Sequence, residues 1–192
     1  MKSGVPFGVR PPDHITIMGG NEQPWLVSES IEYIYKHIDK DMSCYEYGAG
    51  SSTFWFSKFT KKVTSVESDS SWYSQVVSKR DELSIDNIVI ELCECPMISI
   101  TNTDYETDQS YKRYADSIFS TGETFDLILV DGVARSLCIR NALCALKAGG
   151  LLIIDNAERP AYSEAISLIP KPWKLVEFNC SVDRTLVYHK TK

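Results

Sequence analysis

Hydrophobic and polar residues along this chain form patterns that predict strands alternating with amphipathic helices. Two runs in the second half, 125–130 and 151–154, are almost wholly apolar, as expected for central strands buried on both faces of a parallel sheet. Shorter runs rich in β-branched and aromatic residues predict the other strands. The expected strands span residues 44–47, 62–67, 87–93, 125–130, 151–154, 173–178 and 184–189.

Apolar residues at helical spacing predict the helices that lie between these strands. At the start of the first helix, Trp25 is expected to be a buried packing anchor, because large aromatic side chains contribute much when they leave water. Asp69 or Ser70 can cap the third helix. The glycine-containing run 148–150 is expected to end the last one. The expected helices span residues 23–39, 53–58, 69–80, 108–119 and 134–147.

Composition and charge are those of a globular protein of one domain. The chain has 192 residues, of which 24% are charged and 43% hydrophobic. The net charge of −6, with no Lys/Arg cluster, disfavours a nucleic-acid partner, because phosphate binding needs a basic face. No apolar run reaches the length of a membrane span and the N-terminus has no apolar leader, so a cytoplasmic protein is expected. The six cysteines are then interpreted as free thiols in a reducing compartment.

The first 23 residues are expected to form an irregular arm, followed by a single domain over residues 24–192. The arm is rich in glycine and proline, which interrupt regular structure, and it carries Arg10 and His14. Two interpretations follow: a loose terminus, or a flap over a site elsewhere in the chain.

One stretch combines the features of a site for a nucleotide-like ligand. The predicted strand 44–47 is followed by Gly48 and Gly50, and small hydroxyl residues then lead into a helix. Glycines permit a sharp turn and close approach of a ligand, and a helix N-terminus presents unpaired N–H groups. The hydroxyl residues, which can cap this helix or reach the ligand, are Ser51, Ser52 and Thr53.

The next predicted strand ends in an acid. Glu67 follows Gly48 by about 20 residues, the interval at which doubly wound folds place a carboxylate for the ribose hydroxyls of a ligand. A dinucleotide site would have a third glycine or alanine where this chain has Thr53, which weakens a pyrophosphate interpretation. The ligand is therefore expected to carry a ribose.

An acid also lies two residues before the first glycine. The pattern Glu46-x-Gly48-x-Gly50 resembles the first motif of the class I S-adenosylmethionine-dependent methyltransferases, and the likeness extends over about residues 43–156. It implies an α/β, Rossmann-like fold: a doubly wound, mostly parallel seven-stranded sheet with helices on both faces, closed by an antiparallel pair of strands.

The same resemblance implies how the cofactor would be held. The glycine turn would pack against the amino-acid part of S-adenosylmethionine, Glu67 would hold the ribose, and Ser68 would lie at the adenine edge. The cofactor-binding residues expected from these arguments are Glu46, Gly48, Ala49, Gly50, Ser51, Ser52, Thr53, Glu67, Ser68 and Asp131.

A second block is also similar to methyltransferases. It reads Phe-Asp-Leu-Ile-x-Val-Asp-Gly over 125–132 and ends in Asp155-Asn156. In metal-dependent, catechol-type O-methyltransferases, residues at the positions of Asp131, Asp155 and Asn156 bind a divalent cation. The resemblance implies that Mg²⁺ or Ca²⁺ could bind and acidify a hydroxyl acceptor. This chain departs from that family in its shorter interval between the two aspartates. The alternative is that Asp131 shapes the cofactor pocket and Asp155 caps the next helix.

The ends of parallel strands meet at one edge of a sheet, so these residues are expected to line one crevice. Methyl transfer requires an acceptor held in line with the methyl group and, for some acceptors, removal of a proton. Candidates for that chemistry are Asp131, Asp155 and Asn156. Three residues beyond the strand ends are expected to bind an anionic or sugar-like acceptor, unless they are solvated surface groups. They are Arg135, Arg159 and Tyr162.

These arguments predict S-adenosylmethionine-dependent methylation of a small molecule, at oxygen, with no nucleic-acid or membrane partner. The apolar and aromatic residues of the arm could also support a homodimer. Three alternatives stand beside this prediction: a nicotinamide-dependent oxidoreductase, a non-catalytic nucleotide-binding protein of the same fold, and a protein methyltransferase.

Overall fold

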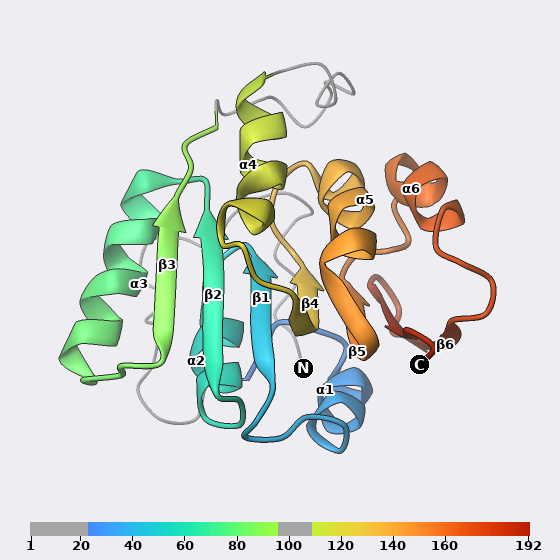
Figure 1. The fold of residues 1–192 in the computed structure, drawn as a ribbon, viewed down its shortest axis with the longest axis horizontal. Coiled ribbons are helices and arrows are strands. Elements are labelled where there is room, and N and C mark those ends of the chain that lie inside the picture. The colour runs from blue at the N-terminus through green and yellow to red at the C-terminus, as the bar shows by residue number, and fades with distance from the viewer. Residues whose placement is uncertain (1–22, 96–108) are drawn as a thin grey trace.

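A computed structural model describes residues 23–95 and 109–192, which form one seven-stranded sheet (Figure 1). The strands are β1 (Ser43–Tyr47), β2 (Lys62–Glu67), β3 (Ile88–Leu92), β4 (Phe125–Val130), β5 (Leu146–Ile154), β6 (Lys174–Asn179) and β7 (Arg184–His189). Their order in the sheet is β3-β2-β1-β4-β5-β7-β6. The first five of these are parallel, and β7 is antiparallel to both of its neighbours. The predicted doubly wound sheet with its closing antiparallel pair is thus confirmed.

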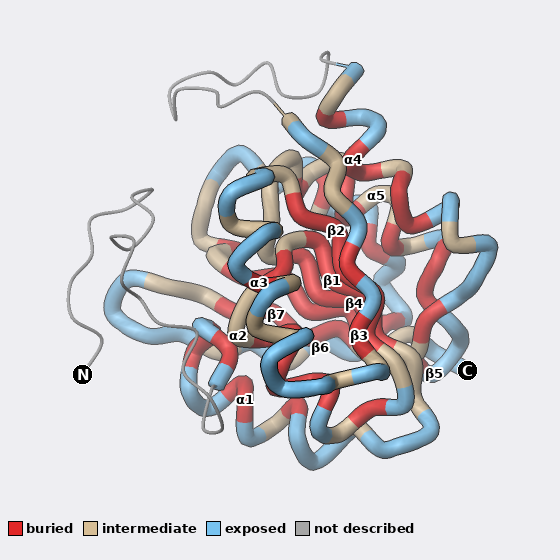
Figure 2. Tube along the Cα trace, turned by 90° about the vertical axis from the view of Figure 1, so that its left-hand side faces the viewer, coloured by how far each residue is buried: buried red, intermediate tan, exposed pale blue. Residues whose placement is uncertain are grey.

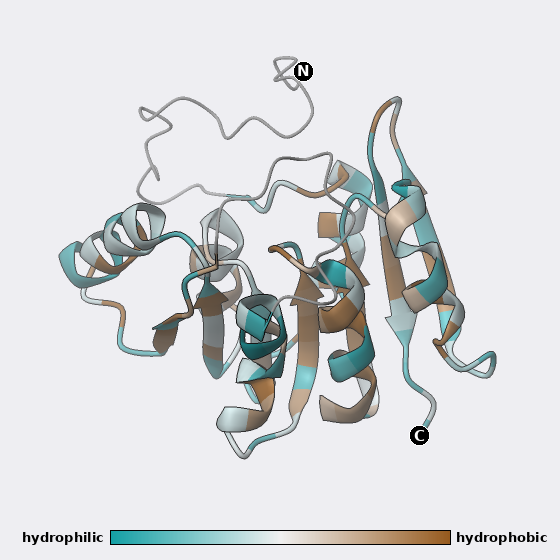
Figure 3. Cartoon of the chain, turned by 90° about the horizontal axis from the view of Figure 1, so that it is seen from above, coloured by the Kyte–Doolittle hydropathy of each residue, from teal (hydrophilic) through white to brown (hydrophobic). Residues whose placement is uncertain are grey.

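Helices cover both faces of the sheet (Figures 1 and 3). They are α1 (Ser28–Tyr35), α2 (Ser51–Ser57), α3 (Ser70–Glu82), α4 (Gln109–Ser120), α5 (Arg135–Ala145), α6 (Ser163–Ser167) and a short 3-10 helix, η2 (Pro160–Tyr162). Apolar residues of α1, α2 and α3 pack together against one face, and those of α4, α5 and α6 against the other. In the part of the chain that the structure describes, no helix is long and apolar enough to cross a membrane.

The core lies on the two central strands (Figure 2). Residues Leu127–Val130 of β4 are fully buried, and Tyr45 and Tyr47 of β1 are nearly so. Neighbouring residues of β1 point to opposite faces, because side chains alternate along a strand. The two tyrosines therefore pack among the α4–α6 helices, whereas Cys44 packs in the cluster of α1–α3. The apolar residues from which these strands were predicted are thus the residues that the fold buries.

Two details of the predicted elements are wrong. Trp25 is 46% exposed, because α1 begins only at Ser28 and the buried positions before it belong to Leu26 and Val27. The run 148–150 does not follow a helix directly but lies within β5, and α5 already ends at Ala145. The register of β4 against β5 shifts between Phe125 and Leu127, which accommodates the glycines within the strand.

Part of the prediction falls outside the described residues. The arm expected over residues 1–23, with Arg10 and His14, lies outside them except for its last residue. Residue 108, where a helix was expected to begin, also lies outside the described residues. The described part of that helix, α4, runs from Gln109 to Ser120.

Candidate functional site

The carboxyl ends of the parallel strands form a row at one edge of the sheet. Hydrogen bonds continue one residue beyond each strand: the Asp131 amide donates to the Tyr47 carbonyl (3.0 Å), and the Asp155 amide to the Val130 carbonyl (3.2 Å). Residues more than eighty positions apart in the sequence, such as Tyr47 and Asp131, are therefore neighbours here. Those that follow or end the strands in this row are Gly48, Glu67, Asp131 and Asp155.

The first glycine of the turn packs directly against a second strand end. Gly48 has φ +96°, a left-handed conformation that favours glycine, and a Cβ there would lie 3.0 Å from the Gly132 Cα. A Cβ on Gly132 would in turn meet the Gly48 amide at 2.9 Å and overlap the hydroxyl of Tyr114. The two glycines therefore allow β1 and β4 to end in contact, with the tip of a buried tyrosine between them and the α4 layer.

The second glycine of the turn, Gly50, has open space beside the position of its missing Cβ. Gly50 has φ 172°, an extended conformation that any residue can adopt, and a Cβ there would come no closer than 3.8 Å to the Trp72 ring. The indole N–H of Trp72 donates to the Ala49 carbonyl (2.7 Å), so α3 fixes the turn from the side. Thr53 is fully buried, and its hydroxyl accepts the Gly50 amide (3.0 Å), which caps α2.

Glu46 is a fully buried acid beneath this turn. The Ser65 hydroxyl donates to its Oε2 atom (2.8 Å), while its Oε1 atom has no hydrogen-bond partner among the described residues. Burial raises the pKa of Glu46 to about 7, against the opposing effect of the hydroxyls of Ser52, Thr53 and Ser65. An acceptor oxygen without a partner at this depth is costly, and it suits a cationic donor from a ligand.

Glu67, at the end of β2, organises the neighbouring loops through backbone amides. Its Oε1 atom accepts from the amides of Ser68 (2.7 Å) and Asp69 (2.8 Å), and its Oε2 atom from that of Ala49 (3.2 Å). The side chain is only 4% exposed. Asp69 then caps α3 by accepting the Trp72 amide (2.7 Å), as the sequence predicted. Glu67 thus links the glycine turn to the start of α3.

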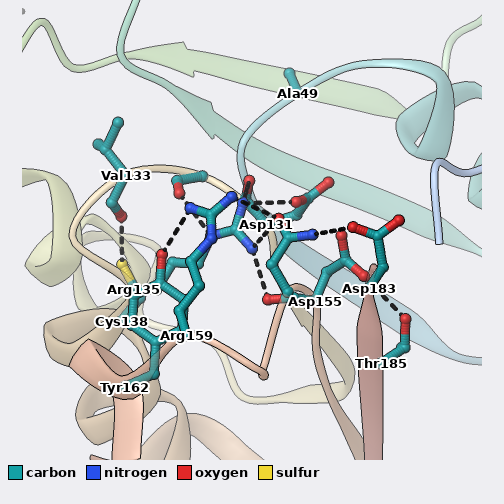
Figure 4. Close-up of polar contacts among 12 residues, drawn as sticks. Ala49, Asp131, Val133, Arg135, Cys138, Asp155, Arg159, Tyr162, Asp183 and Thr185 are labelled. Carbon is teal, nitrogen blue, oxygen red and sulfur yellow. Dashed lines mark hydrogen bonds and ion pairs between the residues drawn. The ribbon is translucent and has the colours of Figure 1, made fainter. Parts of the chain in front are cut away.

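Arg135, expected from the sequence to bind an acceptor, instead ties two strand ends together (Figure 4). Its guanidinium makes five hydrogen bonds within the protein, three of them to backbone carbonyls, and its side chain is 8% exposed. It also forms an ion pair with Asp131, whose side chain is 31% exposed. The five acceptors are Gly132 O (2.9 Å), Asp155 O (2.6 Å), Asn156 Oδ1 (3.2 Å), Asp131 O (2.7 Å) and Asp131 Oδ1 (2.8 Å).

Asn156 lies at the centre of the polar groups around Arg135. Its backbone adopts the left-handed conformation (φ 50°), and its Oδ1 atom also accepts from Arg159 (3.2 Å). Its side-chain amide donates to Asp183 (3.2 Å). Arg159 also donates to the Tyr162 hydroxyl (3.1 Å). The predicted acceptor-binding residues are thus brought together, but in contact with one another and with the strand ends.

Asp155 is buried behind this network. The Thr185 hydroxyl donates to its Oδ1 atom (2.8 Å) and itself accepts the amide of Val27 (3.2 Å). Burial and the nearby charge of Asp131 raise the pKa of Asp155, while Arg135 acts in the opposite direction. This carboxyl group can therefore hold a proton nearer to neutral pH than an exposed aspartate does.

The arrangement does not fit the divalent cation that the sequence suggested. Within residues 23–95 and 109–192, no three His, Cys, Asp or Glu side chains are grouped so that they could hold a metal ion. The oxygens expected to be ligands, from Asp131 and Asn156, are already bonded to the guanidinium of Arg135.

The likeness of this chain to known proteins lies in its structure and not in its sequence. No protein-family model matches the sequence, and no curated protein is significantly similar to it. A Streptococcus mutans protein described as a methyltransferase, and solved in complex with SAH, has a TM-score of 0.66 and 14% identity over 88% of this chain and 99% of that chain. An rRNA methylase from Streptococcus thermophilus has a TM-score of 0.65 and 13% identity, over 91% and 99%.

A methyltransferase-like protein from Silicibacter pomeroyi has a TM-score of 0.64 and 18% identity, over 88% of this chain and 90% of that chain. The chain therefore has the fold of the class I S-adenosylmethionine-dependent methyltransferases. At these identities the comparison establishes the fold, and the chemistry has to be argued from the site.

Two residues of the site, Trp72 and Thr185, were not anticipated from the sequence. Tyr114 belongs to an aromatic and charged stretch before the fourth strand that could have been either a surface helix or part of the acceptor pocket, and its contact with Gly132 was not foreseen. The Asp-Gly pair after an apolar strand was a signal for the close contact at Gly132. No local signal marks Thr185, because its partners are Asp155 and Val27, which are distant in the sequence.

Proposed function

We propose that this protein is an S-adenosylmethionine-dependent methyltransferase that methylates an oxygen atom of a small molecule. The observation that carries the proposal is the placement of Glu46, the glycine turn and Glu67 at adjoining strand ends of this fold. The bound cofactor would supply the activated methyl group on a sulfonium. The work of the protein is then to hold two reactants in line.

Each of these residues fits a part of the cofactor. The buried Oε1 atom of Glu46 would accept the α-ammonium group, which supplies the donor that this oxygen lacks. Gly50 leaves room for the ligand at the start of α2, because among the described residues beyond its chain neighbours only Trp72 lies within 4 Å of the position of its missing Cβ. Glu67 and Ser68 would bind the ribose and the adenine edge.

We assign different roles in the chemistry of the acceptor to Asp131 and Asp155. Asp131 is the more accessible carboxylate, so we assign it the contact with the acceptor hydroxyl. Asp155 is buried, and its raised pKa allows it to take up a proton near neutral pH. Asn156, Arg159 and Tyr162 would shape the acceptor side of the site.

Titration calorimetry with S-adenosylhomocysteine tests the cofactor. The native protein should bind it, and Glu67→Gln should bind it about 10–100-fold more weakly, since a charged acceptor for hydroxyl groups is lost. Glu91→Gln removes an exposed acid from the adjacent strand and is the matched control, with unchanged affinity expected. A folded native protein that does not bind the compound would overturn the proposal.

RNA is the second candidate acceptor, because one of the structural neighbours is an rRNA methylase. Lys112 and Arg113 line a hollow of about 400 Å³ on α4, although Asp116 lines it too, and the net charge of −6 disfavours RNA. Incubating the protein with labelled cofactor and a cell extract decides the class. Label in the small-molecule fraction supports our proposal, whereas label in RNA or in protein would contradict it.

A further inference from the structure

The guanidinium of Arg135 lies among oxygen atoms of the kind that hard divalent cations bind. Side-chain oxygens of Asp131 and Asn156 and the backbone oxygens of residues 131, 132 and 155 all accept hydrogen bonds from it, at 2.6–3.2 Å. Carboxylate, amide and carbonyl oxygens are the ligands of Mg²⁺ and Ca²⁺ in proteins. Here five of them converge on a cation that belongs to the chain itself (Figure 4).

We propose that Arg135 is a built-in cation that takes the place of a divalent metal ion at the ends of β4 and β5. It neutralises the charge of Asp131, fixes the relative position of the two strand ends, and keeps metal ions out of the site. Arg135 is thus a positioning residue. The metal-binding part of this inference is independent of the proposed function, which enters only through the consequence that methyl transfer needs no metal.

The burial and geometry of Arg135 distinguish it from an ordinary surface arginine. Arg140, on the same helix, pairs with Glu164, whose side chain is 80% exposed, and the Arg140 side chain is itself 31% exposed. Such an exposed pair contributes little. The side chain of Arg135 is 8% exposed and binds mainly backbone oxygens, which cannot move away without a shift of the strands. A planar guanidinium satisfies several fixed acceptors at once, which a lysine ammonium does less well.

The neighbouring acids also fit a single fixed positive charge. Asp131 and Asp155 both interact electrostatically with Arg135, and the charge of Asp131 raises the pKa of Asp155, whereas that of Arg135 lowers it. A metal ion in addition to the guanidinium would place two cations within hydrogen-bonding distance of the same oxygens. Removal of the guanidinium should therefore leave an oxygen-lined site that a metal ion can enter.

Terbium luminescence tests this inference without methyl transfer. Tb³⁺ is a probe for Ca²⁺-type oxygen sites, and the ring of Tyr162, with its centroid 5.9 Å from the Arg135 guanidinium carbon, provides a nearby sensitiser. The native protein should give no more sensitised emission than Asp131→Asn. Arg135→Ala should bind Tb³⁺ at least about tenfold more tightly than the native protein, and excess Ca²⁺ should displace it.

Three further variants separate this effect from a general loosening of the fold. The double variant Asp131→Asn/Arg135→Ala should lose the gain in Tb³⁺ binding, since a ligand oxygen is missing. Arg135→Lys keeps the charge and should exclude Tb³⁺, and Arg140→Ala is the matched control on the same helix. Circular dichroism confirms that each variant is folded.

Two results would overturn the inference. The first is Tb³⁺ or Ca²⁺ binding by the native protein that Asp131→Asn abolishes, a comparison that does not depend on whether Arg135→Ala folds. The second is a folded Arg135→Ala variant that binds Tb³⁺ no better than the native protein. Neither result bears on S-adenosylhomocysteine binding, so failure here is distinguishable from failure of the proposed function.

Discussion

At the scale of single residues, three glycines of the site differ in what a side chain would meet. Gly48 and Gly132 lie where β1 and β4 end in contact, whereas Gly50 lies beside open space at the start of α2. Gly132 is fixed by packing, because a Cβ there would collide with backbone and with Tyr114. We expect Gly132→Ala to lower the free energy of unfolding by about 1–3 kcal/mol, the usual range for overpacking. Urea denaturation measures this change.

Gly50→Ala is the matched control for that experiment. Its backbone is extended and its added methyl group would lie 3.8 Å from Trp72, so the stability should stay within about 0.5 kcal/mol of the native value. Binding of S-adenosylhomocysteine should nevertheless weaken, because the methyl group would fill space that we assign to the ligand. Equal stability of the Gly132 and Gly50 variants would contradict the packing argument.

Glu46 predicts a dependence of stability on pH. Its pKa in the folded protein is about 7, above its ordinary value of 4.5, so the folded state binds the proton more tightly than the unfolded chain. The contribution to stability is fully present below pH 4.5 and is lost as the pH rises through about 7. Glu46→Gln, which cannot ionise, should therefore be more stable than the native protein at pH 8, by about 1–3 kcal/mol.

The difference between Glu46→Gln and the native protein should narrow towards pH 5, as measured by urea denaturation at both pH values. Glu91→Gln, which makes the same substitution at an exposed acid of β3, is the control for the substitution itself. The same Glu46 variant should bind S-adenosylhomocysteine more weakly, since it lacks the charge that would hold the ammonium group. If the stability difference between Glu46→Gln and the native protein were the same at pH 5 and pH 8, ionisation of Glu46 would not be its cause.

The sequence predicted the positions of the candidate site residues at the strand ends better than it predicted their partners. Glu46, Gly48 and Glu67 lie at adjoining strand ends, as the succession of strand, turn and acid indicated. The orientation of Arg135 could not be predicted, since a polar residue at the first turn of a helix is ordinarily exposed. Its burial depends on carbonyls at the ends of β4 and β5, which only the folded sheet brings together.

At the scale of elements, the carboxyl end of α5 is stabilised by the residue that follows β7. The ammonium of Lys190 donates to the carbonyls of Leu143 (3.2 Å) and Leu146 (2.7 Å), which the helix itself leaves without amide partners. Lys190→Met keeps the apolar stem and should lower the free energy of unfolding by about 1 kcal/mol. Urea denaturation of Lys171→Met, which removes an exposed lysine, provides the control.

The same region shows why element boundaries were harder to predict than element types. The strand at 151–154 was recognised because it is wholly apolar, yet β5 begins at Leu146. Residues 147–149 are exposed and include a glycine with φ +80°, so they carry no strand signal of their own. Pairing of Leu146 with Phe125 places them in the strand. Tertiary contacts, and not local propensity, decided this boundary.

At the scale of the whole molecule, one hydroxyl connects the first described segment, the last strand and the site. Thr185 accepts the amide of Val27 and donates to Asp155. Thr185→Val is nearly isosteric but leaves a buried amide without its acceptor, so stability should fall by about 1–3 kcal/mol in thermal or urea denaturation. Thr191→Val changes an exposed threonine in the same terminal segment and should have little effect. A stable Thr185→Val protein would show that the Val27 amide finds another partner.

The order of the strands has a consequence for biosynthesis. β7 lies between β5 and β6, although it follows both of them in the sequence, and it also carries the hydroxyl that contacts Asp155. Until β7 has emerged from the ribosome, β5 has no partner on its outer edge and Asp155 lacks that hydrogen bond. A ribosome-bound chain can therefore build the five parallel strands before Asp155 reaches its final environment. Emergence of β7 thus determines when the carboxyl end of β5 can take its folded form.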